Sequence, residues 1–352
     1  MEKLSKTLTL LFFFISTTDI WCQSVQVGII DFYGPRSNDM ELKNCLPFKE
    51  NDIINLDSIG SSFTSVFEYK QAILDWFKQT QPKIKQAELS FICCVDQKGK
   101  WIVYVGVDTI LTQIPERIKA NDIKLPTEIT SVYDSVNDLT IVAIQHGEAD
   151  EDDSNGHSLI TYLPARKLQE KFIKYADANL NLLREVLKTS KYDEQRAVAA
   201  TVIGYYHNKA EIIKDLLEAV TDADQNVRNN ATRAIGIIAE YAQSRPNLKI
   251  EIAADPFIKM MNSILWTDRN KGVSVLRVLS STRDEKLLLK LKDEALESLI
   301  DMANWKSDGH SYVGYLILGR IAGWTEEALN FDSFNKNKNK SELINKMLLT
   351  IK

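Results

Sequence analysis

The chain has 352 residues, of which 44% are hydrophobic and 26% charged, and its formal net charge is −5. This length allows two domains, and the composition is typical of a soluble globular protein. Because basic residues are not in excess, the composition argues against a protein that coats DNA or RNA.

Residues 1–23 have the layout of a signal peptide. Lys3 and Lys6 supply a positive start, residues 8–15 form a short apolar core, and residues 16–24 are more polar. The apolar core is too short to span a bilayer. We therefore expect export to the periplasm, to the cell envelope or to the outside of the cell. The alternative is the buried first helix of a cytosolic protein.

The chain contains four cysteines: Cys22, Cys45, Cys93 and Cys94. Lipidation of Cys22 would anchor the protein to a membrane, but residues 19–21 are not the small residues that usually precede a lipidated cysteine, so we expect simple cleavage near residues 22–24. Adjacent cysteines on a strand point to opposite faces, so only one of Cys93 and Cys94 can face Cys45. A disulfide and buried free thiols both remain open.

Residues 24–115 are predicted to form a small α+β domain. The expected elements are a strand at 25–32, a helix at 39–46, a helix at 63–77, and strands at 87–93 and 101–107 joined by a turn at 96–99. This β-α-α-β-β order resembles the POTRA domain of bacterial envelope proteins. The resemblance includes Tyr33-Gly34, Leu46, the polar turn at 49–52 and the final residues 105–108.

The POTRA resemblance departs from the family pattern at Asn51, where the family usually has glycine; asparagine also tolerates a left-handed backbone. The resemblance implies binding of a partner, often by pairing of a peptide with an exposed sheet edge. The alternative is a generic α+β domain that caps the helical repeats.

Residues 116–178 are predicted to be a helical connecting region, with a helix over 126–149. Acidic residues at 148–153 precede Ser154-Asn155-Gly156-His157-Ser158 and suggest a cation site. If Gly156 is the sixth residue of a calcium loop, the twelfth is Tyr162 instead of the required Glu. A solvated loop between helices is therefore the preferred interpretation.

Residues 179–352 are predicted to be an α-solenoid, because residues 195–204 recur as residues 227–236 after 32 residues. The expected helices span 168–175, 180–190, 194–207, 210–220, 227–241, 257–265, 272–279, 287–303 and 312–321, with a cap helix at 341–351 and a polar linker at 331–340. The pattern resembles HEAT repeats. The residues that carry the motif are Arg196, Gly204, Asp222, Asp224, Val227, Arg228, Ala231 and Gly236.

The HEAT resemblance implies that an arginine of the motif ties neighbouring turns together through an aspartate, here Arg228 through Asp222 or Asp224. The third copy has Asn270-Lys271-Gly272 in place of the Val-Arg pair, so its register is open. Small residues such as Gly236 allow close approach of helices. Trp266, Trp305 and Trp324 are interpreted as packing residues, with a ligand groove as the alternative.

Among the residues that could serve in catalysis or metal binding, the sequence offers only weak candidates for a polar site. These are Asp152, Asp153, His157 and His310. His157 and His310 both stand in Gly-His-Ser tripeptides, which we interpret as helix caps. Nucleophile elbows and phosphate-binding loops are absent from the sequence. We expect no cofactor, no bound metal and no nucleic-acid partner.

The sequence as a whole predicts a multidomain protein, α+β and then all-α: a POTRA-like module followed by a HEAT-like solenoid. Solenoids offer extended binding surfaces. We therefore expect an exported, non-enzymatic scaffold or adaptor that binds protein partners in the cell envelope. The alternatives are a HEAT-like enzyme of the bilin lyase type, which the repeats also resemble, and an envelope protein that binds a metal or small ligand.

Overall fold

The computed structural model describes residues 25–34, 46, 48–54, 64–80, 84–92, 100–109, 120–337 and 339–351. These residues form two compact units. In the described part, the first unit contains residues 120–256, and the second combines residues 25–109 with residues 257–351. The division at residue 256 falls inside the range 179–352, which the sequence pattern predicts as one array. The predicted signal peptide, the helix at 39–46 except Leu46, the turn at 96–99 and the four cysteines lie outside the described residues.

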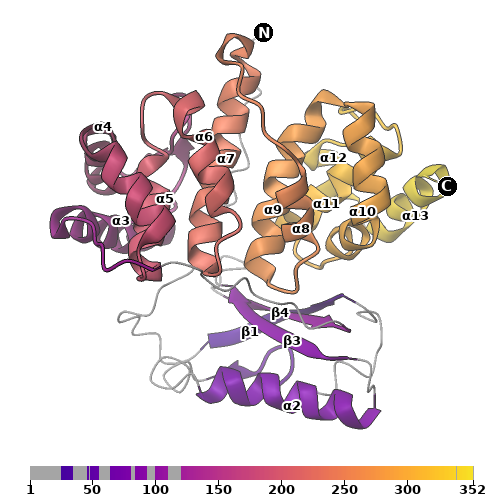
Figure 1. Cartoon of the computed structure of the whole chain (residues 1–352). Coiled ribbons are helices and arrows are strands. Elements are labelled where there is room, and N and C mark those ends of the chain that lie inside the picture. The colour runs from indigo at the N-terminus through magenta and orange to yellow at the C-terminus, as the bar shows by residue number, and fades with distance from the viewer. Residues whose placement is uncertain are drawn as a thin grey trace. The chain divides into compact units, whose positions relative to one another are not determined.

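The N-terminal sheet has the strand order β2-β1-β4-β3. Its strands are β1 (Val25–Tyr33), β2 (Ile53–Ile54), β3 (Gln86–Ile92) and β4 (Trp101–Asp108). β1 and β4 are parallel, and β3 is antiparallel to β4. The three longer strands match the predicted ones, whereas the short β2 was not expected. Figure 1 shows helix α2 (Thr64–Thr80) along one face of the sheet.

Both faces of the central strand β4 are buried, because side chains alternate across a strand and each face has a covering layer. Val103, Val105 and Val107 face Ile73 and Phe77 of α2 in one apolar core. On the opposite face, Tyr104 stacks on Trp266 with a ring-centroid distance of 5.4 Å, so the sheet packs between α2 and the C-terminal helices. The burial of Trp266 and Trp305 supports their interpretation as packing residues.

The helices of the second unit follow the predicted pairs, with one correction. They are α8 (Asp255–Met261), α9 (Trp266–Leu279), α10 (Glu285–Ala303), α11 (Asp308–Ile321), α12 (Phe331–Lys336) and α13 (Lys340–Ile351), with a 3₁₀ turn at Ser280–Thr282. The prediction of a polar linker at 331–340 is wrong for its first half. Phe334 is fully buried in α12 against Tyr312 and Tyr315, which anchors this segment.

The first unit contains two stacked helical hairpins preceded by a connecting region. Its elements are α3 (Thr127–His146), β5 (Glu151–Asp152), β6 (Leu159–Ile160), α4 (Leu163–Thr189), α5 (Asp193–Ile203), α6 (Lys209–Ala219), α7 (Gln225–Gln243) and a 3₁₀ turn at Pro246–Leu248. The two helices predicted at 168–175 and 180–190 are one helix, α4, that is kinked at Asn179.

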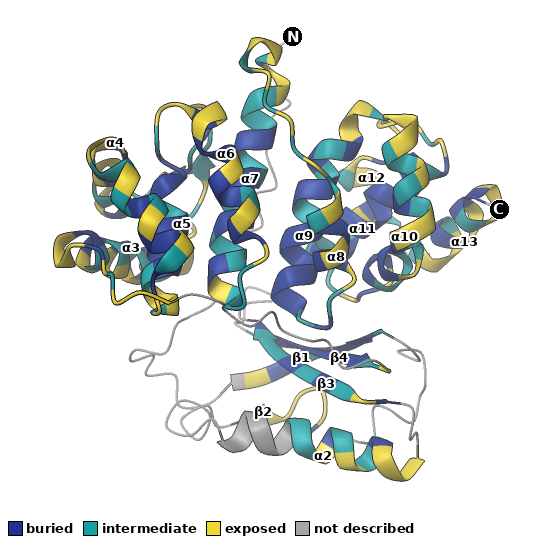
Figure 2. Ribbon diagram, in the orientation of Figure 1, coloured by how far each residue is buried: buried dark blue, intermediate teal, exposed yellow. Residues whose placement is uncertain are grey.

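Burial differs strongly among the helices (Figure 2). Both α5 and α9 are buried along most of their length, whereas α4 and α10 each expose one face. Helices that are buried on nearly all sides are central to their packing layer. Among the described residues, no helix is both long enough and apolar enough to cross a membrane.

Candidate functional site

The two hairpins of the first unit are joined by a buried ion pair. Arg196, at the start of α5, donates two hydrogen bonds of 2.8 Å to the two carboxylate oxygens of Asp222, which precedes α7. A third hydrogen bond, of 3.1 Å, runs from Arg196 to the Ser190 carbonyl. Such bidentate pairs fix geometry as well as charge. Arg196 therefore ties the turn of one repeat to the turn of the next.

The other residues of the repeat motif shape the second hairpin. Asp224 caps α7 by accepting hydrogen bonds from the Asn226 and Val227 amides, as an aspartate at a helix start commonly does. Arg228 donates to the main-chain carbonyls of Asp222 and Ala223 at 2.7 and 2.8 Å, so it supports the same turn. The side chains of Val227 and Ala231 are fully buried.

The motif glycines lie where helices pack closely. A Cβ atom on Gly204 would lie 2.9 Å from the Cβ of Ala234, so the end of α5 contacts α7 without room for a side chain. Gly236, the second motif glycine, is half-buried within α7. Helix backbones can approach this closely only where the residues at the crossing are small, as Gly204 and Ala234 are.

The acidic stretch 148–153 forms the predicted solvated loop only in its first half, where Glu148 and Asp150 are exposed. Residues 151–160 form a short β-hairpin, hereafter the strap, in which β5 pairs antiparallel with β6. Glu151, whose side chain is only 1% exposed, is ion-paired with Arg233 of α7. Asp152 is paired with Arg166 of α4 at 3.0 Å. For Glu151 and Asp152 the prediction of a solvated loop was wrong, because Arg233 and Arg166 supply the countercharges.

Of the four candidate polar residues, Asp152, Asp153 and His157 belong to the strap, and burial changes the acidity of two of them. Burial, together with the charge of Glu151, raises the pKa of Asp153 to about 6. Burial, together with the nearby Lys209 ammonium, lowers the pKa of His157 to about 4. Opposite shifts in neighbouring groups are common at functional sites, although structural networks also produce them.

Lys209, at the first turn of α6, lies beneath the strap. Its Nζ donates to the Gly204 carbonyl at 2.7 Å and lies 3.3 Å from His157 Nδ1. The residue is 4% exposed, and burial lowers its pKa to about 7. His157 also packs against the Tyr205 ring at 5.1 Å. A small cavity of about 40 Å³ beside these groups is lined in part by Thr201, Asn230 and Arg233, enough room for a water molecule.

His310, the fourth candidate, lies in the other compact unit and belongs to a different cluster. Its Nδ1 lies 2.5 Å from the Tyr104 hydroxyl, and its ring packs edge-on against Trp266. Burial lowers the pKa of His310 to about 3, so the ring is neutral. It stands in the first turn of α11, and the Gly-His-Ser of the strap leads into β6. The helix-cap interpretation was therefore wrong for both tripeptides.

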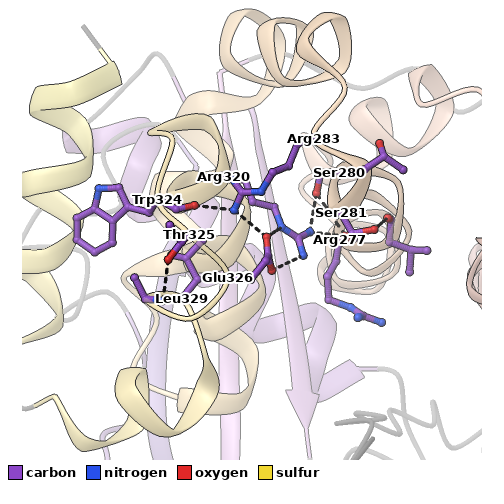
Figure 3. Close-up of polar contacts among 12 residues, drawn as sticks. Arg277, Ser280, Ser281, Arg283, Arg320, Trp324, Thr325, Glu326 and Leu329 are labelled. Carbon is purple, nitrogen blue, oxygen red and sulfur yellow. Dashed lines mark hydrogen bonds and ion pairs between the residues drawn. The ribbon is translucent and has the colours of Figure 1, made fainter. Parts of the chain in front are cut away.

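A second buried arginine joins turns in the second unit (Figure 3). Arg320 of α11 donates two hydrogen bonds of 3.0 Å to the carboxylate of Glu326. It also donates to the Arg277 carbonyl and to Ser280 Oγ at the end of α9. Arg283 donates to the same carboxylate at 2.8 Å. These hydrogen bonds lower the pKa of Glu326.

A cavity of about 700 Å³ in the second unit lies between one end of the sheet and α10. Its wall includes Arg269, which stacks on the Tyr33 ring and is ion-paired with Asp301 at 3.6 Å. Asp301 in turn accepts a hydrogen bond from the Gly34 amide at 2.9 Å. Within the described part of the chain, no three His, Cys, Asp or Glu side chains are grouped closely enough to hold a metal ion.

Several residues of these clusters were not among the sequence candidates. Lys209 follows Asn208 at a helix start, a position that ordinarily faces solvent, and Arg233 lies 82 residues from its partner Glu151. The pairing of Arg320 with Glu326 crosses a turn that the helix pattern did not resolve. In each case the role of the residue depends on a contact in the folded chain, and no local spacing in the sequence reveals that contact.

Comparison with known proteins supports the repeat architecture. A family model for HEAT repeats matches residues 180–258. This range covers the end of α4, the helices α5–α7 and the start of α8, and it includes the Arg196–Asp222 pair. No curated protein matches the chain. HEAT repeats suggest a helical scaffold for protein–protein interaction.

Proposed function

We propose that this protein is an exported, non-enzymatic scaffold that binds protein partners in the cell envelope. The observation that carries the proposal is the stack of α4–α5 on α6–α7, held by the Arg196–Asp222 pair within the range that matches HEAT repeats. Stacked hairpins of this type present an extended side surface, and partner binding is their most common use.

The flank formed by α4 and α6 is the surface that we assign to the partner. An ionic network crosses it: Arg184 contacts Glu211 and Asp215, and Lys188 contacts Asp215 and Glu218. Exposed side chains of both signs surround this network, among them Lys174, Asp177, Glu185 and Lys214. A rigid helix pair with alternating charge suits a polar protein surface of complementary pattern.

The N-terminal sheet is assigned a second contact. We propose that it is a POTRA-like module that pairs its edge with an extended peptide. β3 has a sheet neighbour on one side only among the described residues, and its seven residues are long enough for strand addition. The expected signal peptide at residues 1–23 places both contacts outside the cytoplasm.

The test of the scaffold is recovery of a stoichiometric partner with the full-length protein from its native cells. Lys214→Glu reverses an exposed charge on the proposed flank, and Lys78→Glu makes the same change on α2, where the side chain is 65% exposed. We expect Lys214→Glu to reduce partner recovery several-fold and Lys78→Glu to leave it unchanged. Equal recovery with both variants would refute the assignment of the flank.

Export is tested separately by the intact mass of the protein from those cells. We expect a mature chain that begins near residue 23 or 25, with no added lipid. An intact chain that still carries residues 1–22 would refute the export part of the proposal and leave the scaffold part standing.

A further inference from the structure

The strap covers part of α5 and α7, the second helices of the two hairpins. Its Glu151 binds Arg233 on α7, and the Ser158 carbonyl accepts a hydrogen bond from Tyr205 at 2.7 Å. At the tip, Gly156 lies directly over two side chains: a Cβ there would be 3.0 Å from the Tyr241 ring and 3.1 Å from Lys209 Cε. The tip therefore closes tightly over the amine of Lys209.

The environment of that amine suits its neutral form better than its charged form. The hydrogen-bond partners of Nζ are the Gly204 carbonyl and the His157 ring, and neither carries a negative charge. Burial without a countercharge disfavours an ammonium ion. The charge of Asp177 on α4 raises the pKa of Lys209, but this effect is smaller than that of burial. Opening the strap would expose Nζ to water and remove this penalty.

We propose that the strap is a proton-linked latch over α5 and α7, in which opening at the tip exposes Lys209 and lets its amine take up one proton. The titratable and charged groups that face Lys209 and the strap are Glu151, Asp152, Asp153 and His157 of the strap, Arg166 and Asp177 of α4, Tyr205 after α5, Arg233, Glu240 and Tyr241 of α7, and Arg245 after α7.

The direction of the linkage follows from the two states of Lys209. In the closed strap its pKa is about 7, and in water it is 10.5. Between these values the open form holds a proton that the closed form lacks. Each unit of pH above 7 therefore lowers the opening constant by about tenfold, until pH approaches 10.5. Below pH 7 Lys209 is protonated in both forms and its contribution is constant.

Asp153 and His157 do not cancel this linkage, because both groups change protonation below the range in which Lys209 acts. Their pKa values in the closed strap are about 6 and about 4. The strap covers α5 and α7, whereas the flank assigned to a partner is formed by α4 and α6, so the latch does not rest on the proposed function.

Hydrogen exchange of the full-length protein tests the latch without any partner. The observed exchange rate of a protected amide is its opening constant multiplied by its intrinsic rate, which rises roughly tenfold per pH unit. The strap amides of Gly156 and Ile160 are both hydrogen-bonded. We expect their observed rates to stay nearly constant from pH 7 to 9, while control amides of α10, in the other unit, speed up about tenfold per unit.

The variant Lys209→Met removes the titrating amine and keeps an unbranched apolar stem. We expect its strap amides to regain the tenfold rise per pH unit of the control helix. Strap amides that follow the α10 controls in the unmodified protein would overturn the latch. That comparison is made within one molecule, so it decides the question even if the variant does not fold.

Discussion

Arg196 and Asp222 lie on successive helical hairpins and meet through two parallel hydrogen bonds of 2.8 Å. The Arg196 side chain is 5% exposed and that of Asp222 is 11% exposed, so the pair is largely shielded from water. This contact couples the turn before α7 to the start of α5. It adds a shielded charge pair to the contacts of α4 with α6, which are also bridged by ion pairs.

Removal of one member of this pair should destabilise the first unit strongly. Asp222→Ala leaves the Arg196 guanidinium buried without its countercharge, which typically costs about 3–5 kcal/mol. Arg196→Lys keeps the charge but loses the planar fork, so we expect an intermediate loss. Urea unfolding of the full chain measures both. Glu185→Ala, at an exposed position on α4, is the control, and a loss from Asp222→Ala no larger than its effect would contradict the account.

Gly106 should be intolerant of any side chain. A Cβ there would lie 2.5 Å from the Ile264 carbonyl and 2.7 Å from the Tyr33 hydroxyl, and the carbonyl cannot move without shifting the turn after α8. We expect Gly106→Ala to destabilise the second unit by about 1–3 kcal/mol, as overpacking of a core commonly does. Ser90→Ala on the neighbouring strand is the control. Hydrogen exchange of β4 and α11 should report the change, and unaltered protection there would show that the sheet does not pack on these helices as described.

Asp153 and His157 should compensate each other in acid. Asp153 has a pKa of about 6 in the folded chain and 3.8 when free, so acidification from pH 6 to 4 favours folding through this group. His157 has a pKa of about 4 when folded and 6.5 when free, so the same acidification opposes folding. Between pH 6 and 4 the contributions of Asp153 and His157 to the free energy of unfolding change in opposite directions. Their sum therefore changes little with pH.

Single substitutions should separate the contributions of Asp153 and His157 to the pH dependence of stability. Relative to the unmodified chain, Asp153→Asn should become less stable as the pH falls from 6 to 4, and His157→Gln should become more stable. Urea unfolding at several pH values between 4 and 6.5 measures the difference for each variant. Parallel pH profiles for the two variants would show that the strap does not hold these groups as the structure places them.

Glu326 should make the second unit sensitive to acid. Its pKa is lowered by hydrogen bonds from Arg320 and Arg283, so its stabilising contribution is present above the ordinary value of 4.5 and is lost as the pH falls through the lowered value. Glu326→Gln should reduce the acid sensitivity of the second unit and cost about 1 kcal/mol at neutral pH, because the carboxylate is 48% exposed. Thermal unfolding between pH 3 and 7 checks both statements. An acid sensitivity that Glu326→Gln leaves unchanged would exclude this carboxylate as its source.

Much of the secondary structure could be predicted from the sequence because it depends on local periodicity. The strands at 25–32 and 101–107 and the helices of the repeats follow from alternation and from apolar stripes, and the 32-residue echo indicated the stacked hairpins. The kink at Asn179 and the short helix α12 were missed. The anchoring of Phe334 depends on Tyr312 and Tyr315, which no local pattern connects to it.

The polar clusters could be predicted only in part, because their chemistry arises from tertiary contacts. Asp152, Asp153 and His157 were recognised as candidates, but Glu151 and Lys209, which contribute to the shifted acidity of Asp153 and His157, were not. Arg228 was expected to tie the repeats through an aspartate. The carboxylate of Asp222 is instead held by Arg196 of the preceding repeat, while Arg228 supports the same turn through main-chain carbonyls.

The central claim, that the repeat flank binds a protein partner, is tested most directly by site-specific photo-cross-linking in the native cells. A photoreactive residue replaces Lys214 on α6, Asn181 on α4 or, as the control, Asp75 on α2; all three positions are exposed. We expect positions 214 and 181 to form a cross-link to the same protein and position 75 to form none to it. The absence of any cross-link from 214 and 181, or the same products from all three positions, would contradict the claim.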